Sequence, residues 1–223
     1  MSWTGILLAV IASMVTLVVL RSAYPFFEVD KQYEIKGLGA SDEAWASYLG
    51  QKRLVDTKNI AVLMSVLGGA LGVAFAALRP ASVGLVVRLL SSAVVGALVG
   101  AVAGSAAFYL QQFFAGQGRI SVLQSVMVHS LLFASLGLGL GILSGAFTKN
   151  GSIALQRAGA GLVAGLFAGI AYPILASLLF ATVDIDALIP STLAAQVMWL
   201  LLGAVFLGWL IPRTTSEPLA GEI

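Results

Sequence analysis

Few residues in the apolar parts of this sequence could do chemistry. His129 is the only histidine among 223 residues, and Gln124, Ser125 and Ser130 lie near it. Because an ionisable group inside an apolar helix indicates a functional site, His129 and Gln124 are our candidates for a ligand or pathway site. His129 is also the one candidate ligand for a tetrapyrrole or a metal. No second histidine or carboxylate stands at a helical spacing from it, which favours a hydrogen bond between helices or at the membrane interface.

Two aspartates, Asp184 and Asp186, stand one residue apart in a predicted loop. Paired carboxylates attract a cation, but a complete site needs more oxygen ligands than this loop offers. We therefore predict no metal site.

Four arginines, Arg79, Arg88, Arg119 and Arg157, lie near the ends of apolar stretches. A charge at the bilayer centre costs about 3 kcal/mol on insertion scales, and no acidic residue falls inside a predicted span to pair with it. We expect these arginine side chains to extend to the lipid phosphates.

The sequence lacks the motifs of the common enzyme classes. It contains no Walker-type loop, HExxH, GxSxG or pair of intramembrane aspartates, and it contains no cysteine. We therefore predict a protein that is not an enzyme and that has no resident cofactor.

Composition defines the elements that carry these residues. Hydrophobic residues make up 59% of the chain, charged residues 10%, and the mean hydropathy is +1.00. Several apolar runs reach the ~20 residues that a helix needs to cross a bilayer. We predict an all-α, polytopic integral membrane helical bundle in the lipid bilayer, with about six transmembrane helices. Their ranges are 3–24, 60–78, 89–111, 122–147, 153–181 and 188–211. The net charge of +2, without a basic cluster, excludes a nucleic-acid partner.

One sizeable polar segment, residues 28–59, connects the first two spans. Its second half begins with Ser41 as a cap, followed by two acids and then by Trp45, Tyr48 and Leu49 on one helical face. This pattern predicts an interfacial amphipathic helix that lies on the membrane and runs into the second span. A docking site for a partner is the alternative. The C-terminal residues 213–223 are polar, without periodicity, and are predicted to be disordered.

Glycines recur at every fourth position in the four central spans, although glycine is a poor helix former. Residues four apart lie on one helical face, and in lipid the close approach of two backbones drives helix association. The pattern resembles a glycine zipper and predicts helix packing through Gly68, Gly72, Gly96, Gly100, Gly104, Gly137, Gly141, Gly145, Gly161, Gly165 and Gly169.

The glycine stripes also indicate an internal repeat. The second and fourth spans align at an offset of 69 residues, and the third and fifth at 65. We therefore predict a duplicated helical hairpin, with copies at 60–114 and 119–182. A first anchor helix at 1–27 and a last helix at 187–212 flank the two copies.

These observations favour a structural or assembly subunit, or a scaffold, of a membrane complex, whose partners are other membrane subunits or a second copy. The alternative is a small-solute transporter or channel built from the two hairpins. We expect the protein in the bacterial inner membrane, with both termini in the cytoplasm.

Overall fold

The computed structural model describes residues 3–35, 41–78, 84–146, 150–180 and 187–211. All regular structure in these ranges is helical. The elements are α1 (Trp3–Ala23), the short 3-10 helix η1 (Lys31–Tyr33), α2 (Asp42–Ala77), α3 (Leu85–Ala115), α4 (Val122–Ala146), α5 (Gly151–Leu179) and α6 (Leu193–Leu210). The six α-helices of the described ranges are all long and apolar enough to cross a membrane, which confirms the all-helical prediction with six candidate spans.

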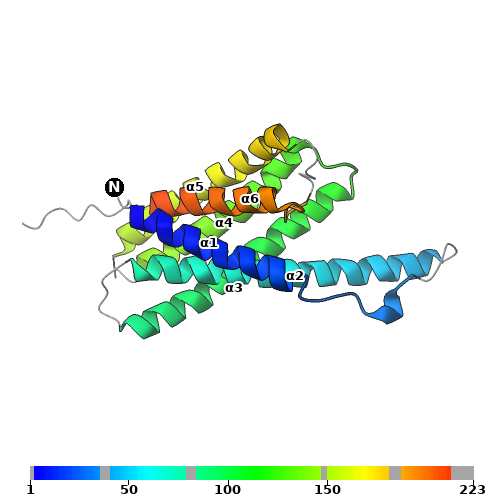
Figure 1. The fold of residues 1–223 in the computed structure, drawn as a ribbon, viewed down its shortest axis with the longest axis horizontal. Coiled ribbons are helices and arrows are strands. Elements are labelled where there is room, and N and C mark those ends of the chain that lie inside the picture. Colours follow the sequence, from blue (N-terminus) through cyan, green and yellow to red (C-terminus); the bar gives the residue numbers. More distant parts are fainter. Residues whose placement is uncertain (1–2, 36–40, 79–83, 147–149, 181–186, 212–223) are drawn as a thin grey trace, which may run out of the picture.

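The helices pack as sequential neighbours. α2 packs along α3, and α4 packs along α5, so the chain forms two hairpins that meet where α3 contacts α4 (Figure 1). The outer helices α1 and α6 pack against each other, and they contact α2 and α5 respectively. Gly208 of α6 lies against the backbone of Gly5 and Ile6 in α1. Each outer helix is therefore held by its partner and by one hairpin.

α2 is longer than the predicted span. Its predicted cap is present, because the Ser41 hydroxyl accepts a hydrogen bond from the Ala44 N–H at 3.3 Å. The helix then runs unbroken from Asp42 to Ala77, and its first half projects beyond the other helices (Figure 1). The segment predicted as an amphipathic helix is thus the first part of one continuous helix with the second span.

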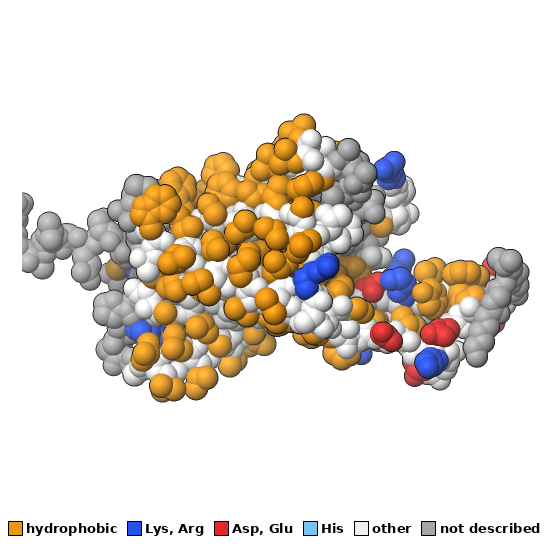
Figure 2. All heavy atoms as spheres, viewed as in Figure 1, with side chains coloured by type: hydrophobic (Ala, Val, Ile, Leu, Met, Phe, Trp, Pro, Cys, Tyr) orange, Lys and Arg blue, Asp and Glu red, His pale blue; other side chains and the backbone are white. Residues whose placement is uncertain are grey.

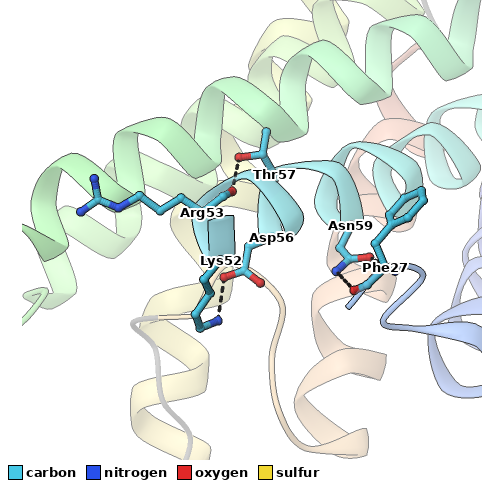
Figure 3. A network of polar contacts seen from close by, with 6 residues as sticks. All are labelled: Phe27, Lys52, Arg53, Asp56, Thr57 and Asn59. Atoms are coloured by element: carbon cyan, nitrogen blue, oxygen red, sulfur yellow. Dashed lines mark hydrogen bonds and ion pairs between the residues drawn. The ribbon is translucent and has the colours of Figure 1, made fainter. Parts of the chain in front are cut away.

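Asn59 fixes the base of this projection. Its side-chain amide donates to the Phe27 carbonyl at 2.9 Å and its amide oxygen accepts from the Phe27 N–H at 2.8 Å (Figure 3). Burial of the neighbouring Tyr24 raises the pKa of its phenol, and the charge of Asp56 raises that pKa further. The chain after α1 is therefore held against α2 where α2 leaves the bundle.

Apolar side chains cover much of the bundle surface, whereas acidic and basic side chains gather around the projecting part of α2 (Figure 2). The exposed apolar residues include Leu98 and Val102 of α3, Phe167 of α5 and Leu178 near its end. This distribution fits helices whose outer faces contact lipid. The predicted disordered tail, 213–223, lies outside the described residues.

Candidate functional site

In the first hairpin, the predicted packing glycines lie between α2 and α3. A Cβ added to Gly68 would clash with the Gly96 carbonyl oxygen, and one added to Gly96 would clash with the Gly68 carbonyl oxygen. A Cβ on Gly100 would likewise clash with the Met64 carbonyl, and one on Gly72 with the Ser92 carbonyl. Gly104 faces the Met64 side chain. The two backbones therefore touch along this interface.

The second hairpin has equivalent contacts between α4 and α5. Gly137 and Gly161 each face the carbonyl of the other, and Gly141 faces the Arg157 carbonyl. The remaining three glycines continue the interface: Gly165 faces the Phe133 carbonyl, Gly169 the backbone of Ser130, and Gly145 the Cα of Ala154. All eleven predicted glycines thus face a neighbouring helix of the same chain.

His129 lies on the same face of α4, eight residues before Gly137, and is 1% exposed. Its Nδ1 lies 2.9 Å from the Ser125 carbonyl, so Nδ1–H donates to a carbonyl of its own helix. Its Nε2 makes no hydrogen bond within the described residues, although the Leu188 backbone lies nearby. The ring packs against Tyr172 with centroids 4.8 Å apart.

Gln124, the second predicted candidate, is occupied by a structural role. Its Oε1 accepts from the Ser121 N–H at 2.8 Å, and the Ser121 hydroxyl accepts from the Gln124 N–H at 3.3 Å. This reciprocal pair is a capping box at the start of α4. The spacing Ser-x-x-Gln before an apolar run was the signal for this role. Gln124 and His129 therefore form no common site.

Several buried polar atoms lie on α4, α5 and α6. The Ser130 hydroxyl, the Tyr172 hydroxyl, the Gln196 Oε1 and the Trp199 Nε1 have no hydrogen-bond partner within the described residues. Gln196 donates to the Pro190 carbonyl at 2.9 Å, and the Trp199 ring lies 5.6 Å from the Phe133 ring. Asp184 and Asp186 lie outside the described residues, within which no cluster of three or more His, Cys, Asp or Glu side chains could hold a metal ion.

The prediction that Arg88 and Arg157 extend to the lipid phosphates was wrong. Arg88 is 6% exposed and Arg157 is 1% exposed, so both lie inside the bundle. The reason is their register: Arg157 stands four residues before Gly161, and Arg88 eight residues before Gly96, on the faces that pack closely. Position on the glycine stripe was the signal that could have predicted their burial.

The two arginines approach the same end of α4. Arg157 Nη1 donates to the Ser144 carbonyl. Arg88 lines a small cavity of about 10 Å³, together with Ser92 of α3 and Ser144. The cavity wall also includes Gly72, Phe75, Ala76, Leu140 and Leu143. We define the arginine pocket as Arg88, Ser92 and Ser144; Arg157 adjoins it through its hydrogen bond to Ser144. The pocket joins the first hairpin to the second.

Comparison of the chain with protein-family models, with curated proteins and with solved structures finds no match.

Proposed function

We propose that this chain is a non-catalytic multi-pass membrane protein that acts as a structural or assembly subunit of a membrane complex. The observation that carries the proposal is the projecting half of α2, which is held rigidly by the bundle and has an exposed aromatic face. We further propose that the bundle is a frame of two duplicated glycine-zipper hairpins. Its membrane, in this proposal, is the bacterial inner membrane, with both termini in the cytoplasm.

The glycine contacts support the duplication. The pair Gly68 and Gly96 becomes Gly137 and Gly161 when the offsets of 69 and 65 residues are applied. The contact of Gly100 with the Met64 carbonyl becomes the contact of Gly165 with the Phe133 carbonyl. A composition bias alone would give glycine-rich helices, but it would not match their contacts pair by pair.

The length of α2 supports the assembly role. Its 36 residues span ~54 Å at ~1.5 Å per residue, whereas a bilayer core is ~30 Å thick. About 24 Å of helix therefore stands beyond the core. On this part Trp45 is 47% exposed and contacts Tyr48 edge to face, and Leu49 is exposed beside them.

A polypeptide is the partner that best fits this surface. The helix points away from the bilayer, so lipid cannot cover its aromatic face. Acidic residues Asp42 and Glu43 precede that face and basic residues Lys52 and Arg53 follow it, so a partner with both signs of charge would complement it. Aromatic residues within a charged rim are typical of protein interfaces.

The test is co-purification of the full chain from its native membrane in mild detergent, quantified by mass spectrometry. We expect a partner at fixed stoichiometry that is lost in the Trp45→Ser, Leu49→Ser double variant. Ser47 lies on the opposite side of the helix, so Ser47→Ala is the matched control and keeps the partner. A chain that purifies alone under all conditions contradicts the assembly role. Pairing with a second copy only would make the protein a self-assembling scaffold.

The second candidate is a small-solute transporter, and it is favoured by the buried polar side chains of Ser92 and Ser144 where the two hairpins meet. The test is uptake of labelled phosphate into liposomes that contain the purified chain. Flux that is lost in Ser92→Leu and kept in Ser105→Leu on the same helix would favour transport over assembly.

A further inference from the structure

The projecting part of α2 carries an exposed stripe of side chains along one face. Asp42, Trp45, Leu49 and Lys52 follow one another at intervals of three, four and three residues, so they share one helical face. All four side chains are exposed. We call these four residues the α2 seam. Alternating intervals of three and four residues are those by which helices pair in coiled coils.

The α2 seam complements a reversed copy of itself. Asp42 stands five residues before position 47, and Lys52 stands five residues after it. Trp45 and Leu49 each stand two residues from the same position, on either side of it. When two such helices pair antiparallel about position 47, Asp42 of each copy meets Lys52 of the other. Trp45 of each copy then meets Leu49 of the other.

The charges of the seam are available for this pairing. Asp42 forms no ion pair within the described residues. Lys52 binds Asp56 of its own helix at 2.8 Å, but its side chain is half exposed and its ammonium has three N–H donors, so it can bind a second carboxylate. The exposed Arg53 extends away from Asp56 and adds positive charge at the same end of the seam (Figure 3).

Pairing of two copies within one membrane would not use this complementarity. Copies in the same bilayer project to the same side, so their α2 helices run parallel and each seam residue meets its equivalent. Asp42 would then face Asp42, and Lys52 would face Lys52. Juxtaposed like charges at an interface are unfavourable. An antiparallel pair instead requires the two projections to come from opposite directions.

We propose that the α2 seam pairs antiparallel with the seam of a second copy in an opposing bilayer, so that the chain connects two membranes whose same faces lie opposite each other. This inference rests on the proposed function, because it takes the projecting part of α2 as the assembly surface and names its partner. Position 47 lies 12 residues, or ~18 Å, before Asn59 at the base of the projection. The Asn59 levels of two upright copies are therefore ~36 Å apart.

The small size of the seam makes a single pair weak. From Asp42 to Lys52 the seam is ~15 Å long, so one pair buries less than the ~1,200 Å² of a stable interface. Two opposing membranes carry many copies, and pairs that form simultaneously raise the overall strength of association without any new contact. The association is therefore expected to be strongest between membranes.

The first test measures clustering of phosphatidylcholine liposomes that contain the purified full chain. Liposomes labelled with a donor dye are mixed with liposomes labelled with an acceptor dye, and energy transfer reports contact between the two populations. We expect the original chain to cluster liposomes, whereas liposomes without protein stay apart. The Trp45→Ser, Leu49→Ser double variant should lower the clustering rate by about tenfold or more, because pairs that act together multiply a loss in each pair. Ser47→Ala, on the opposite side of the helix, is the matched control and keeps the rate.

The second test exchanges the two charges of the seam. Asp42→Lys alone, or Lys52→Glu alone, places like charges opposite each other in the antiparallel pair and should slow clustering strongly. The double variant Asp42→Lys, Lys52→Glu keeps the net charge and restores opposite charges between its own copies. We expect liposomes with this double variant to cluster with each other but not with liposomes of the original chain. Clustering of the double variant with itself also shows that its helix is folded.

Three outcomes would overturn the inference. They are no clustering by the original chain, an equal rate in the Trp45→Ser, Leu49→Ser variant, and equal clustering of the charge-exchanged variant with itself and with the original chain. Co-purification separates this failure from a failure of the proposed function. If liposomes do not cluster but a different polypeptide is lost from the Trp45→Ser, Leu49→Ser variant, the assembly role stands and only the pair between copies fails. Absence of clustering together with a chain that purifies alone contradicts both.

Discussion

The close approach of α4 and α5 can be tested by two alanine substitutions on α5, one at Gly161, which faces α4, and one at Gly159, which does not. A Cβ at Gly161 would clash with the Gly137 carbonyl oxygen and lie 2.6 Å from the carbonyl carbon, whereas ordinary contacts begin at 3.4 Å. The helices must therefore separate by more than about 0.8 Å, because the oxygen lies closer than the carbon, and this separation weakens dispersion along the interface. Gly159 has no neighbour within 4 Å of an added Cβ. Both substitutions gain helix propensity of up to about 1 kcal/mol, so this gain cancels in their comparison.

We expect Gly161→Ala to be less stable than Gly159→Ala by about 1–3 kcal/mol, the usual cost of overpacking. Gly159→Ala itself should match or exceed the original chain. The assay is unfolding by sodium dodecyl sulfate in mixed micelles, followed by tryptophan fluorescence, because Trp199 is fully buried beside Phe133 of α4. Equal unfolding midpoints for the two variants would refute the backbone contact between Gly161 and Gly137.

Three smaller substitutions test other contacts. Asn59→Ala should lower the free energy of unfolding by about 1–3 kcal/mol, because it leaves the Phe27 N–H and carbonyl without their partner. Amide hydrogen exchange should rise first at residues 24–30, and unchanged exchange there would contradict the role of Asn59 in holding this segment. Gln124→Ala should cost about 1 kcal/mol in unfolding experiments, and Gln124→Glu should restore it through the capping box with Ser121. Tyr172→Phe removes a buried hydroxyl that has no partner among the described residues, so the midpoint of thermal unfolding should stay constant or rise, and a fall would indicate a ligand or water at that hydroxyl.

The helix-forming stretches and their packing faces could be predicted because both depend on local pattern. Apolar runs of sufficient length specify helices in a bilayer, where each backbone group must be satisfied within the helix. The predicted start of the fourth span, Val122, agrees with the structure. The last span was predicted to start at Leu188, but α6 starts at Leu193 because Thr192 caps it. Glycines at four-residue intervals mark the helical face that has no side chains, and such a face is expected to pack directly against another backbone.

The burial of Arg88 and Arg157 was not predicted because only the charge of these residues was considered, and not their position on the glycine-bearing helical faces. The cost of a charge in lipid predicts an exposed arginine, whereas the position of Arg157 on the packing face of α5 predicts a buried one. In the structure the packing face decides, since the Arg157 carbonyl lies directly against Gly141 and leaves its side chain inside. The polar segment before Ile60 is helical and continuous with the span because Ser41 caps it and no proline stands between Ser41 and the span; Gly50 does not interrupt the helix.

The glycine frame and the arginine pocket depend on each other. Ser92 is both the residue whose carbonyl limits the side chain at position 72 and the residue whose hydroxyl faces the cavity, so the spacing of α2 and α3 sets the width of the pocket. Close packing excludes water from this end of the bundle, which strengthens the electrostatic interactions that the two buried arginines make there.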